Sequence, residues 1–254
     1  MPQSDLRRRL ATLGVAALFA ACSNPTAPSP NAAGGSMSMT PAPAPTPTPT
    51  PAPTPTPASA MARYRVTFDA TWSAATHPTD IPGRPHFSPL IGGTHDATVA
   101  FWMPGGLASE GIERMAEMGF TSPLDAEIRA AIADGRAGFL LTGGDVFHSP
   151  ASTSFEFDIT TTHPLVTLVT MVAPSPDWFV GVSGLSLLRD GQWVDQLVVS
   201  LRPWDAGTDS GTTYESPDSD TQPSMPITAL TGYPVATGGT VAPMGTFTFS
   251  RLGI

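Results

Sequence analysis

The chain has 254 residues, of which 21 are acidic and 12 are arginine, and its formal net charge is −9. An acidic chain without lysine repels a phosphate backbone, so nucleic acid is excluded as an expected partner. Cys22 is the only cysteine, which excludes a disulfide within the chain. In an oxidising compartment the fold would rest on core packing alone.

The first 22 residues have the pattern of an export signal. Three arginines at residues 7–9 precede an apolar stretch that has the length of a signal-peptide core and is too short to span a membrane. Small residues lead to Cys22, so we predict a bacterial lipoprotein signal over residues 1–22 with a lipid on Cys22. Ordinary secretory cleavage with a free thiol and twin-arginine export are the alternatives. Ser23 favours an outer-membrane or cell-surface location, with membrane attachment through the lipid anchor only.

Residues 23–61 are predicted to form a disordered linker. They are rich in proline, threonine and alanine and carry no charge. Such a segment cannot bury enough apolar surface to fold, and its prolines favour an extended polyproline II conformation. At the rise of that conformation the linker could reach about 100 Å. It would serve either as a stalk behind the anchor or as a plain disordered tail.

Residues 62–254 read as one folded domain with a net charge of about −11. Residues 63–70 alternate apolar and polar side chains, which predicts a half-buried strand. Residues 77–96 are dense in proline and glycine and predict a long ordered loop. A second strand is expected over residues 97–103.

Three histidines lie in this predicted loop, His77, His86 and His95. Three histidines raise the question of zinc, but their spacing of nine residues matches no compact ligand motif, and no cysteine lies near them. Hydrogen bonds that fix the loop are the expected role of these side chains.

Two short helices are predicted, over residues 107–119 and 122–134. Ser109 is the expected N-cap of the first helix, and Gly119 is expected to end it. The glutamates of this helix, Glu117 among them, are expected on its solvent-exposed face.

The rest of the domain consists of strand-like runs separated by turns. Together with the first two strands they predict an all-β fold, an antiparallel β-sandwich of about eight strands with one or two short inserted helices. Outside the segment described next, these runs cover residues 138–147, 152–160, 164–173 and 245–252.

Three aspartates flank a predicted β-hairpin. Two strand-like runs, residues 178–188 and 192–203, are joined by an Arg-Asp-Gly turn. Asp177 precedes the first run, and Asp205 and Asp209 follow the second. Because a hairpin brings its open ends together, the three carboxylates are expected to converge.

Five segments in the expected order resemble the spondin N-terminal domain family of F-spondin and mindin. The resemblance implies an antiparallel β-sandwich similar to calcium-dependent phospholipid-binding domains, one bound calcium ion, and an adhesion or recognition role without catalysis. The segments are residues 71–82, 86–96, 107–119, 163–184 and 204–217.

The calcium carboxylates of that family fall on Asp177, Asp205 and Asp209, the same three that the hairpin brings together. Animal members carry cysteines in the hairpin turn, which this chain lacks. Calcium takes six to eight oxygen ligands, so carbonyl groups and water would complete the set. Taken singly, each aspartate could instead cap a turn.

Two other functions remain open. Asp205 and Asp209 could form the acid and base of a glycosidase, which would make the protein an extracytoplasmic hydrolase of an envelope polysaccharide or ester. A purely structural envelope protein is the third possibility. For the recognition domain, the expected ligand is an extracellular protein, a glycan or a lipid surface.

Overall fold

The structure is a computed structural model and describes residues 58–253. The predicted signal peptide with Cys22, and residues 23–57 of the predicted linker, lie outside the described residues. None of the helices in the described part is long and apolar enough to cross a membrane.

One sheet of the domain has four antiparallel strands in the order β10-β15-β1-β5. Its strands alternate between buried and exposed side chains, as expected of a sheet with one face on a core. These strands are β1 (Met61–Ala70), β5 (Ala151–Thr160), β10 (Gln196–Leu201) and β15 (Gly245–Leu252).

The second sheet has seven strands and is buried on both faces. Its order is β12-β11-β7-β6-β3-β4, with β2 paired to β6. Eight of the nine residues of β6 are buried, which agrees with a central strand rich in branched apolar side chains. The strands are β2 (His86–Phe87), β3 (Ile91–His95), β4 (Ala137–Thr142), β6 (Leu165–Ala173), β7 (Trp178–Ser186), β11 (Trp204–Asp205) and β12 (Thr228–Ala229).

Two helices and two small hairpins complete the described chain. Ser109 caps the first helix by accepting from the backbone N–H of Ile112, and Gly119 ends it in the left-handed conformation, as predicted. The helices are α1 (Glu110–Met118) and α2 (Leu124–Ala133). The hairpins pair β8 (Leu188–Arg189) with β9 (Gln192–Trp193) and β13 (Ala236–Thr237) with β14 (Thr240–Val241).

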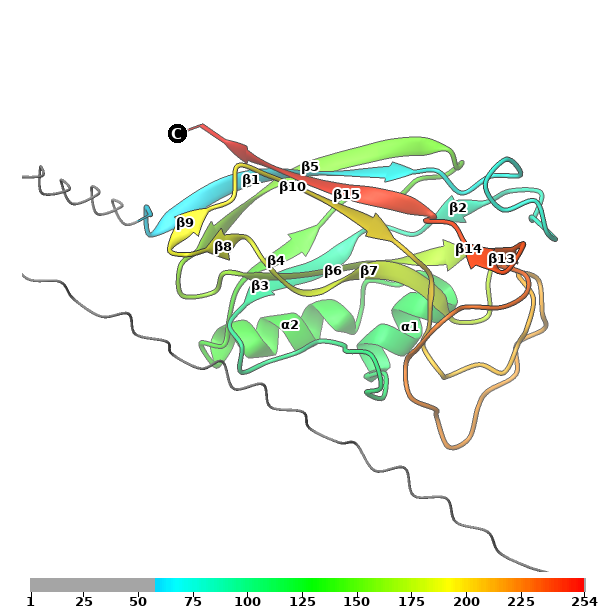
Figure 1. Ribbon diagram of the computed structural model, residues 1–254. Helices are drawn as coiled ribbons and strands as arrows, with labels where there is room; N and C mark the ends of the chain where they lie inside the picture. Colours follow the sequence, from blue (N-terminus) through cyan, green and yellow to red (C-terminus); the bar gives the residue numbers. More distant parts are fainter. Residues whose placement is uncertain (1–57, 254) are drawn as a thin grey trace, which may run out of the picture. The chain divides into compact units, whose positions relative to one another are not determined.

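The domain has three layers, as Figure 1 shows: the four-stranded sheet, the seven-stranded sheet, and the two helices on the outer face of the latter. The main core fills the space between the sheets, where Tyr64, Phe68 and Phe247 are buried. A second core lies between the helices and the sheet and includes Ile112 and Ile128. Eight described strands have five or more residues, so the predicted antiparallel sandwich of about eight strands with two short helices is confirmed.

The predicted hairpin over residues 178–203 is wrong beyond its turn. Only the two-residue strands β8 and β9 pair across it, while β7 pairs with β6 and β10 crosses to the other sheet to pair with β15. Two hydrogen bonds from the four-stranded sheet fix the segment that crosses between the sheets. The hydroxyl of Tyr64 donates to the backbone carbonyl of Val194, and the backbone N–H of Arg251 donates to the backbone carbonyl of Asp195.

The predicted loop over residues 77–96 and the strand over residues 97–103 are also corrected. The end of this loop is the fully buried strand β3, in which glycine permits close packing: a Cβ on Gly92 would lie 2.0 Å from the carbonyl oxygen of Thr167. The apolar residues after it, Phe101 and Trp102, belong to the helix-side core but lie in irregular backbone.

Candidate functional site

The structure brings Asp177 and Asp205 together through strand pairing. Asp177 immediately precedes β7, and Asp205 lies in β11, which pairs antiparallel with β7 so that Asp205 is opposite Trp178. The backbone N–H of Ala206 donates to the carbonyl of Asp177 at 3.1 Å, which extends this pairing by one residue. The two residues therefore lie at the same end of the β7–β11 pair, although no long hairpin connects them.

Asp177 is fully buried and only partly hydrogen-bonded. Its Oδ2 accepts from the backbone N–H groups of Thr208 at 2.8 Å and Asp209 at 3.2 Å. Its Oδ1 is buried and accepts no hydrogen bond from any described residue. A buried carboxylate oxygen without a partner is rare and unfavourable, so it requires a physical explanation.

Asp205 and Asp209 shape the loop that follows β11. Oδ1 of Asp205 accepts from the backbone N–H of Gly207 at 2.8 Å. Asp209 uses both oxygens, which accept from the N–H groups of Gly211 at 2.6 Å and Ser219 at 2.8 Å. The turn-capping role considered for these aspartates is thus real, and a carboxylate oxygen that accepts one hydrogen bond retains a further lone pair for another partner.

The loop that carries Asp209 toward Asp177 turns at Gly207, a position that requires a glycine. Its φ is +76°, and a Cβ at this position would lie 2.1 Å from the carbonyl oxygen of Met225. The backbone N–H of Met225 also donates to the carbonyl of Gly207 at 2.7 Å. A side chain at residue 207 would therefore displace one wall of the site.

The three carboxylates repel one another in this arrangement. Burial raises the pKa of Asp177 to about 6, and the charges of Asp205 and Asp209 raise it as well, against the N–H groups that favour its charged form. Burial also raises the pKa of Asp205, as does the charge of Asp209. The indole of Trp178 lies beside Asp205 and lowers its pKa, although its N–H does not reach hydrogen-bonding geometry.

The carboxylates of Asp177, Asp205 and Asp209 are the kind of oxygen ligand that a hard divalent cation prefers. A cation beside Oδ1 of Asp177 would give the orphaned oxygen a partner and offset the mutual repulsion. Within residues 58–253, however, no group of three His, Cys, Asp or Glu side chains is arranged to hold a metal ion. The ligand set Asp177, Asp205 and Asp209 therefore stays a prediction.

Glu117 is a member of this acidic neighbourhood that sequence reasoning missed. It was expected on the solvent-exposed face of its helix, yet it lies half-buried against Asp209 and Asp218. Burial raises its pKa, and the charges of Glu113, Asp209 and Asp218 raise it further, while Thr208 lowers it. Helical spacing places Glu117 on the α1 surface, but nothing in the sequence shows that the loop after β11 returns to cover it.

A small cavity opens beside Asp209. It has a volume of about 230 Å³ and gives the otherwise buried Asp209 an opening to solvent. Its lining consists of Glu117, Met118, Ser175, Pro176, Asp209, Ser216 and Asp218.

The three histidines do not converge. Nε2 of His77 contacts the carbonyl of Ala242, Nδ1 of His86 contacts that of Arg84, and Nε2 of His95 contacts the hydroxyl of Thr167. Each ring thus fixes a separate piece of backbone or strand, which is the role expected from their spacing.

Comparisons with known proteins match most of the described domain. A family model described as Spondin_N matches residues 62–236. Spondin-1 of Homo sapiens is 42% identical over 176 residues, which cover 67% of this chain and 22% of the human protein. Spondin-1 of Xenopus laevis is 36% identical over 203 residues, which cover 75% of this chain and 25% of the relative. Spondin-2 of Rattus norvegicus is 38% identical over 180 residues, which cover 67% of this chain and 53% of the relative. The matched part thus spans a quarter or less of the Spondin-1 relatives and about half of Spondin-2.

Proposed function

The chain belongs to the Spondin_N family, and on that premise we propose that residues 62–254 form a non-catalytic recognition or adhesion domain that binds one calcium ion. The observation that carries the calcium proposal is the buried Oδ1 of Asp177, which has no partner among the described residues and lies beside two further carboxylates.

Asp177, Asp205 and Asp209 would hold the ion. Calcium accepts flexible sets of six to eight oxygens, so backbone carbonyls of the 205–209 loop and water would complete its coordination. Magnesium is disfavoured because it requires a stricter octahedron. Bound calcium would neutralise the repulsion that raises the pKa values of Asp177 and Asp205. In this way it would fix the loop after β11 against the edge of β7.

The domain is proposed to act outside the cytoplasm, attached through a lipid on Cys22 and held away from the envelope by residues 23–61. Its ligand would be an extracellular protein, a glycan or a lipid surface. Incorporation of a labelled fatty acid tests the anchor, because the wild-type chain should take up the label and Cys22→Ala should not. An unlabelled wild type, or equal labelling of the two proteins, would contradict lipid attachment at Cys22.

A calcium titration of thermal stability tests the metal site. A ligand that binds only the folded state stabilises it by about 2.7 kcal/mol at a hundred times its dissociation constant, which a melting temperature detects readily. We expect calcium to raise the melting temperature and a chelator to reverse the effect. The paired variant Asp205→Asn with Asp209→Asn should abolish the response. Asp195→Asn is the matched control, because Asp195 is an exposed aspartate at the crossing into β10, where its carboxylate pairs with Arg251.

An unchanged melting temperature with calcium, or an equal response in the paired variant, would overturn the calcium proposal. No observation favours the hydrolase alternative. Asp209 is only 6% exposed and uses both oxygens for backbone N–H groups, so it is poorly placed to act as an acid or base on a polysaccharide.

A further inference from the structure

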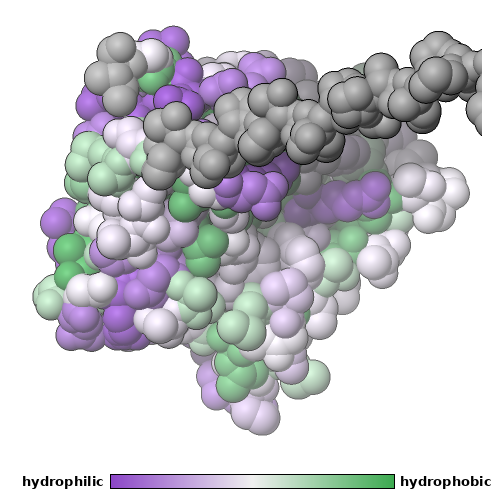
Figure 2. Space-filling view, turned by 60° about the vertical axis from the view of Figure 1, so that its left-hand side comes forward, coloured by the Kyte–Doolittle hydropathy of each residue, from purple (hydrophilic) through white to green (hydrophobic). Residues whose placement is uncertain are grey.

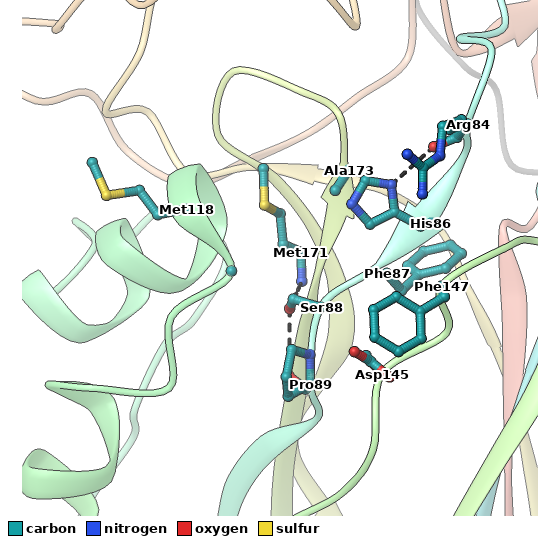
Figure 3. A pocket seen from close by; sticks show the side chains of 11 residues that line it. Arg84, His86, Phe87, Ser88, Pro89, Met118, Asp145, Phe147, Met171 and Ala173 are labelled. Carbon is teal, nitrogen blue, oxygen red and sulfur yellow. Dashed lines mark hydrogen bonds between the residues drawn. The ribbon is translucent and has the colours of Figure 1, made fainter.

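A second, larger cavity lies next to the one beside Asp209, and Met118 lines both. Its volume is about 390 Å³, which falls in the range typical of sites for small ligands. The segment around β2 forms one wall, and the end of α1, strand β6 and the segment after β4 form the others. Figure 3 shows how these side chains surround it: Arg84, His86, Phe87, Ser88, Pro89, Met118, Asp145, Phe147, Met171 and Ala173.

The backbone around this cavity has no free strand edge to offer a peptide. The backbone N–H of Phe87 donates to the carbonyl of Val146, and the backbone N–H of Val146 donates to the carbonyl of Phe87. On its other side, β2 pairs with β6. Ser88 is also satisfied, since its hydroxyl accepts from the N–H of Met171. A ligand must therefore be recognised by side chains rather than by strand addition.

Three polar side chains at the cavity keep functional groups available. Arg84 is exposed and forms no ion pair with a described residue, and the carboxylate of Asp145 likewise has no described partner. His86 places Nδ1 2.8 Å from the carbonyl of Arg84, so Nδ1 must carry the proton. In the neutral ring Nε2 is then an acceptor for a hydroxyl group.

Aromatic and sulfur-containing side chains lie between these polar groups. Figure 3 shows the rings of His86, Phe87 and Phe147 between Arg84 and Asp145, with Met171 and Met118 on the other side. Phe147 is 70% exposed and Met118 is 47% exposed. A large aromatic face exposed beside unpaired polar groups is a typical platform for a ring that has one apolar face.

We propose that this cavity binds an acidic sugar unit, with its carboxylate on Arg84, a ring face on Phe147, and hydroxyl groups on Asp145 and His86. Arg84 offers two parallel N–H groups to a carboxylate, and Asp145 accepts from hydroxyl groups. A zwitterionic amino acid fits less well. Its two charges are one carbon apart, whereas Arg84 and Asp145 form no ion pair, and Figure 3 shows the rings of His86, Phe87 and Phe147 between them.

A glycan fits this cavity better than a broad protein interface does, because Phe147 and Met118 are the exposed large apolar side chains that line it. On the side of the domain that Figure 2 brings forward, hydrophobic residues also form small separate groups among hydrophilic ones. A compact polar ligand needs no large apolar patch, whereas stable protein interfaces have an apolar core. The inference rests on the recognition role proposed above but does not depend on calcium.

Methyl NMR of the full chain with labelled methionine tests the proposal. The probes are a galactose trimer that carries one galacturonic acid unit, whose single carboxylate Arg84 can pair, and the matching neutral trimer of galactose. We expect the acidic trimer to shift the methyl signal of Met171, which lines this cavity and not the one beside Asp209, and to leave Met225 unchanged. Arg84→Gln should weaken binding about tenfold or more, because it removes a charge-assisted hydrogen bond. Phe147→Ala should weaken it as well.

Arg189→Gln is the matched control, since Arg189 is an exposed arginine in the β8–β9 hairpin and outside the cavity. Its affinity should equal that of the wild type. Equal binding of both trimers, no shift at Met171, or equal losses in the two arginine variants would each overturn the inference. The response of the melting temperature to calcium reports on the Asp177 site alone, so the two proposals can fail separately.

Discussion

Trp178 and Asp205 are opposite each other on β7 and β11, although β8, β9 and β10 lie between them in the chain. After β7 the chain crosses to the four-stranded sheet, where it forms β10. It then returns to the seven-stranded sheet as β11, which pairs with β7. The convergence of Asp177 with Asp205 thus depends on a return across two sheets. The loop after β11 then determines where Asp209 lies.

The first prediction concerns Gly207, the residue on which this loop turns. Gly207→Ala should lower the free energy of unfolding by about 3 kcal/mol or more, because an alanine there is strained at positive φ and also collides with Met225. It should also abolish the calcium response of the melting temperature. Urea denaturation with and without calcium measures both effects.

Gly191→Ala is the matched control for that variant. Gly191 has a φ of +71°, close to that of Gly207, but a Cβ there would meet nothing within 4 Å. Its substitution should cost about 1 kcal/mol from backbone strain alone and leave the calcium response intact. Similar losses in the two variants would show that the close approach to Met225 is unimportant.

The second prediction concerns pH in the presence of a chelator. The pKa of Asp177 is raised to about 6 from an ordinary value of 3.8, so the folded state holds this proton more tightly than the unfolded state. The stability that protonation contributes is present below about pH 4 and is lost as pH rises to about 6, a loss of about 2 to 3 kcal/mol. The raised pKa of Asp205 acts in the same direction.

Asp177→Asn isolates this effect from the other titrating groups. Without calcium, the variant should gain stability relative to the wild type as pH rises from 4 to 7, because an amide never acquires the buried charge. With calcium at pH 7, the order should reverse, since the wild type retains its ligand. Melting temperatures between pH 4 and 7.5 measure both. If both proteins show the same pH slope in chelator, Asp177 is not buried as a strained carboxylate.

The sequence predicts the classes of element well because the signals are local. The alternation in residues 63–70, the Ser109 cap and the Gly119 end all arise within a few residues of the position that they fix. The partner of β10 could not be predicted, because its alternation is equally compatible with either sheet. Glycine is an ambiguous signal in the sequence, because it occurs both in loops and in strands that pack closely. Gly92 was expected in a loop but permits close packing within a buried strand.

The candidate site was predictable only in part. The sequence predicts that a hairpin brings Asp177 and Asp205 together. In the structure, the pairing of β11 with β7 does so after the chain has crossed to the other sheet and returned. Glu117 and the cavity around Arg84 and Phe147 could not be expected, because each joins segments that are distant in the chain and have no shared pattern.

The third prediction compares two buried tyrosines. Tyr64 donates its hydroxyl to the carbonyl of Val194 at the crossing into β10. The hydroxyl of Tyr214 is buried beside the indole of Trp72, which lowers its pKa, but the two groups do not reach hydrogen-bonding geometry and the hydroxyl has no other partner among the described residues. Tyr64→Phe should therefore cost about 1 to 2 kcal/mol, whereas Tyr214→Phe should change stability by less than about 0.5 kcal/mol. Equal costs in chemical denaturation would contradict this assignment of hydrogen bonds.

The fourth prediction concerns Glu127, which joins the two helices. This residue of α2 accepts from the hydroxyl of Ser109 and from the backbone N–H of Gly111, both at 2.7 Å, at the N-terminus of α1. Glu127→Ala should lower the free energy of unfolding by about 1 to 2 kcal/mol, because it leaves part-buried donors unpaired and removes a favourable charge from a helix N-terminus.

Arg129→Ala provides the control on the same helix. Its side chain is exposed and forms no ion pair with a described residue, so this truncation should change stability by less than about 0.5 kcal/mol. Glu127→Ala should loosen the start of α1 and so increase amide exchange along the helix before global unfolding. This helix also carries Glu117 and Met118, which line the cavity beside Asp209. Unchanged exchange in α1 of Glu127→Ala would show that packing against the sheet, and not this carboxylate, holds the helix in place.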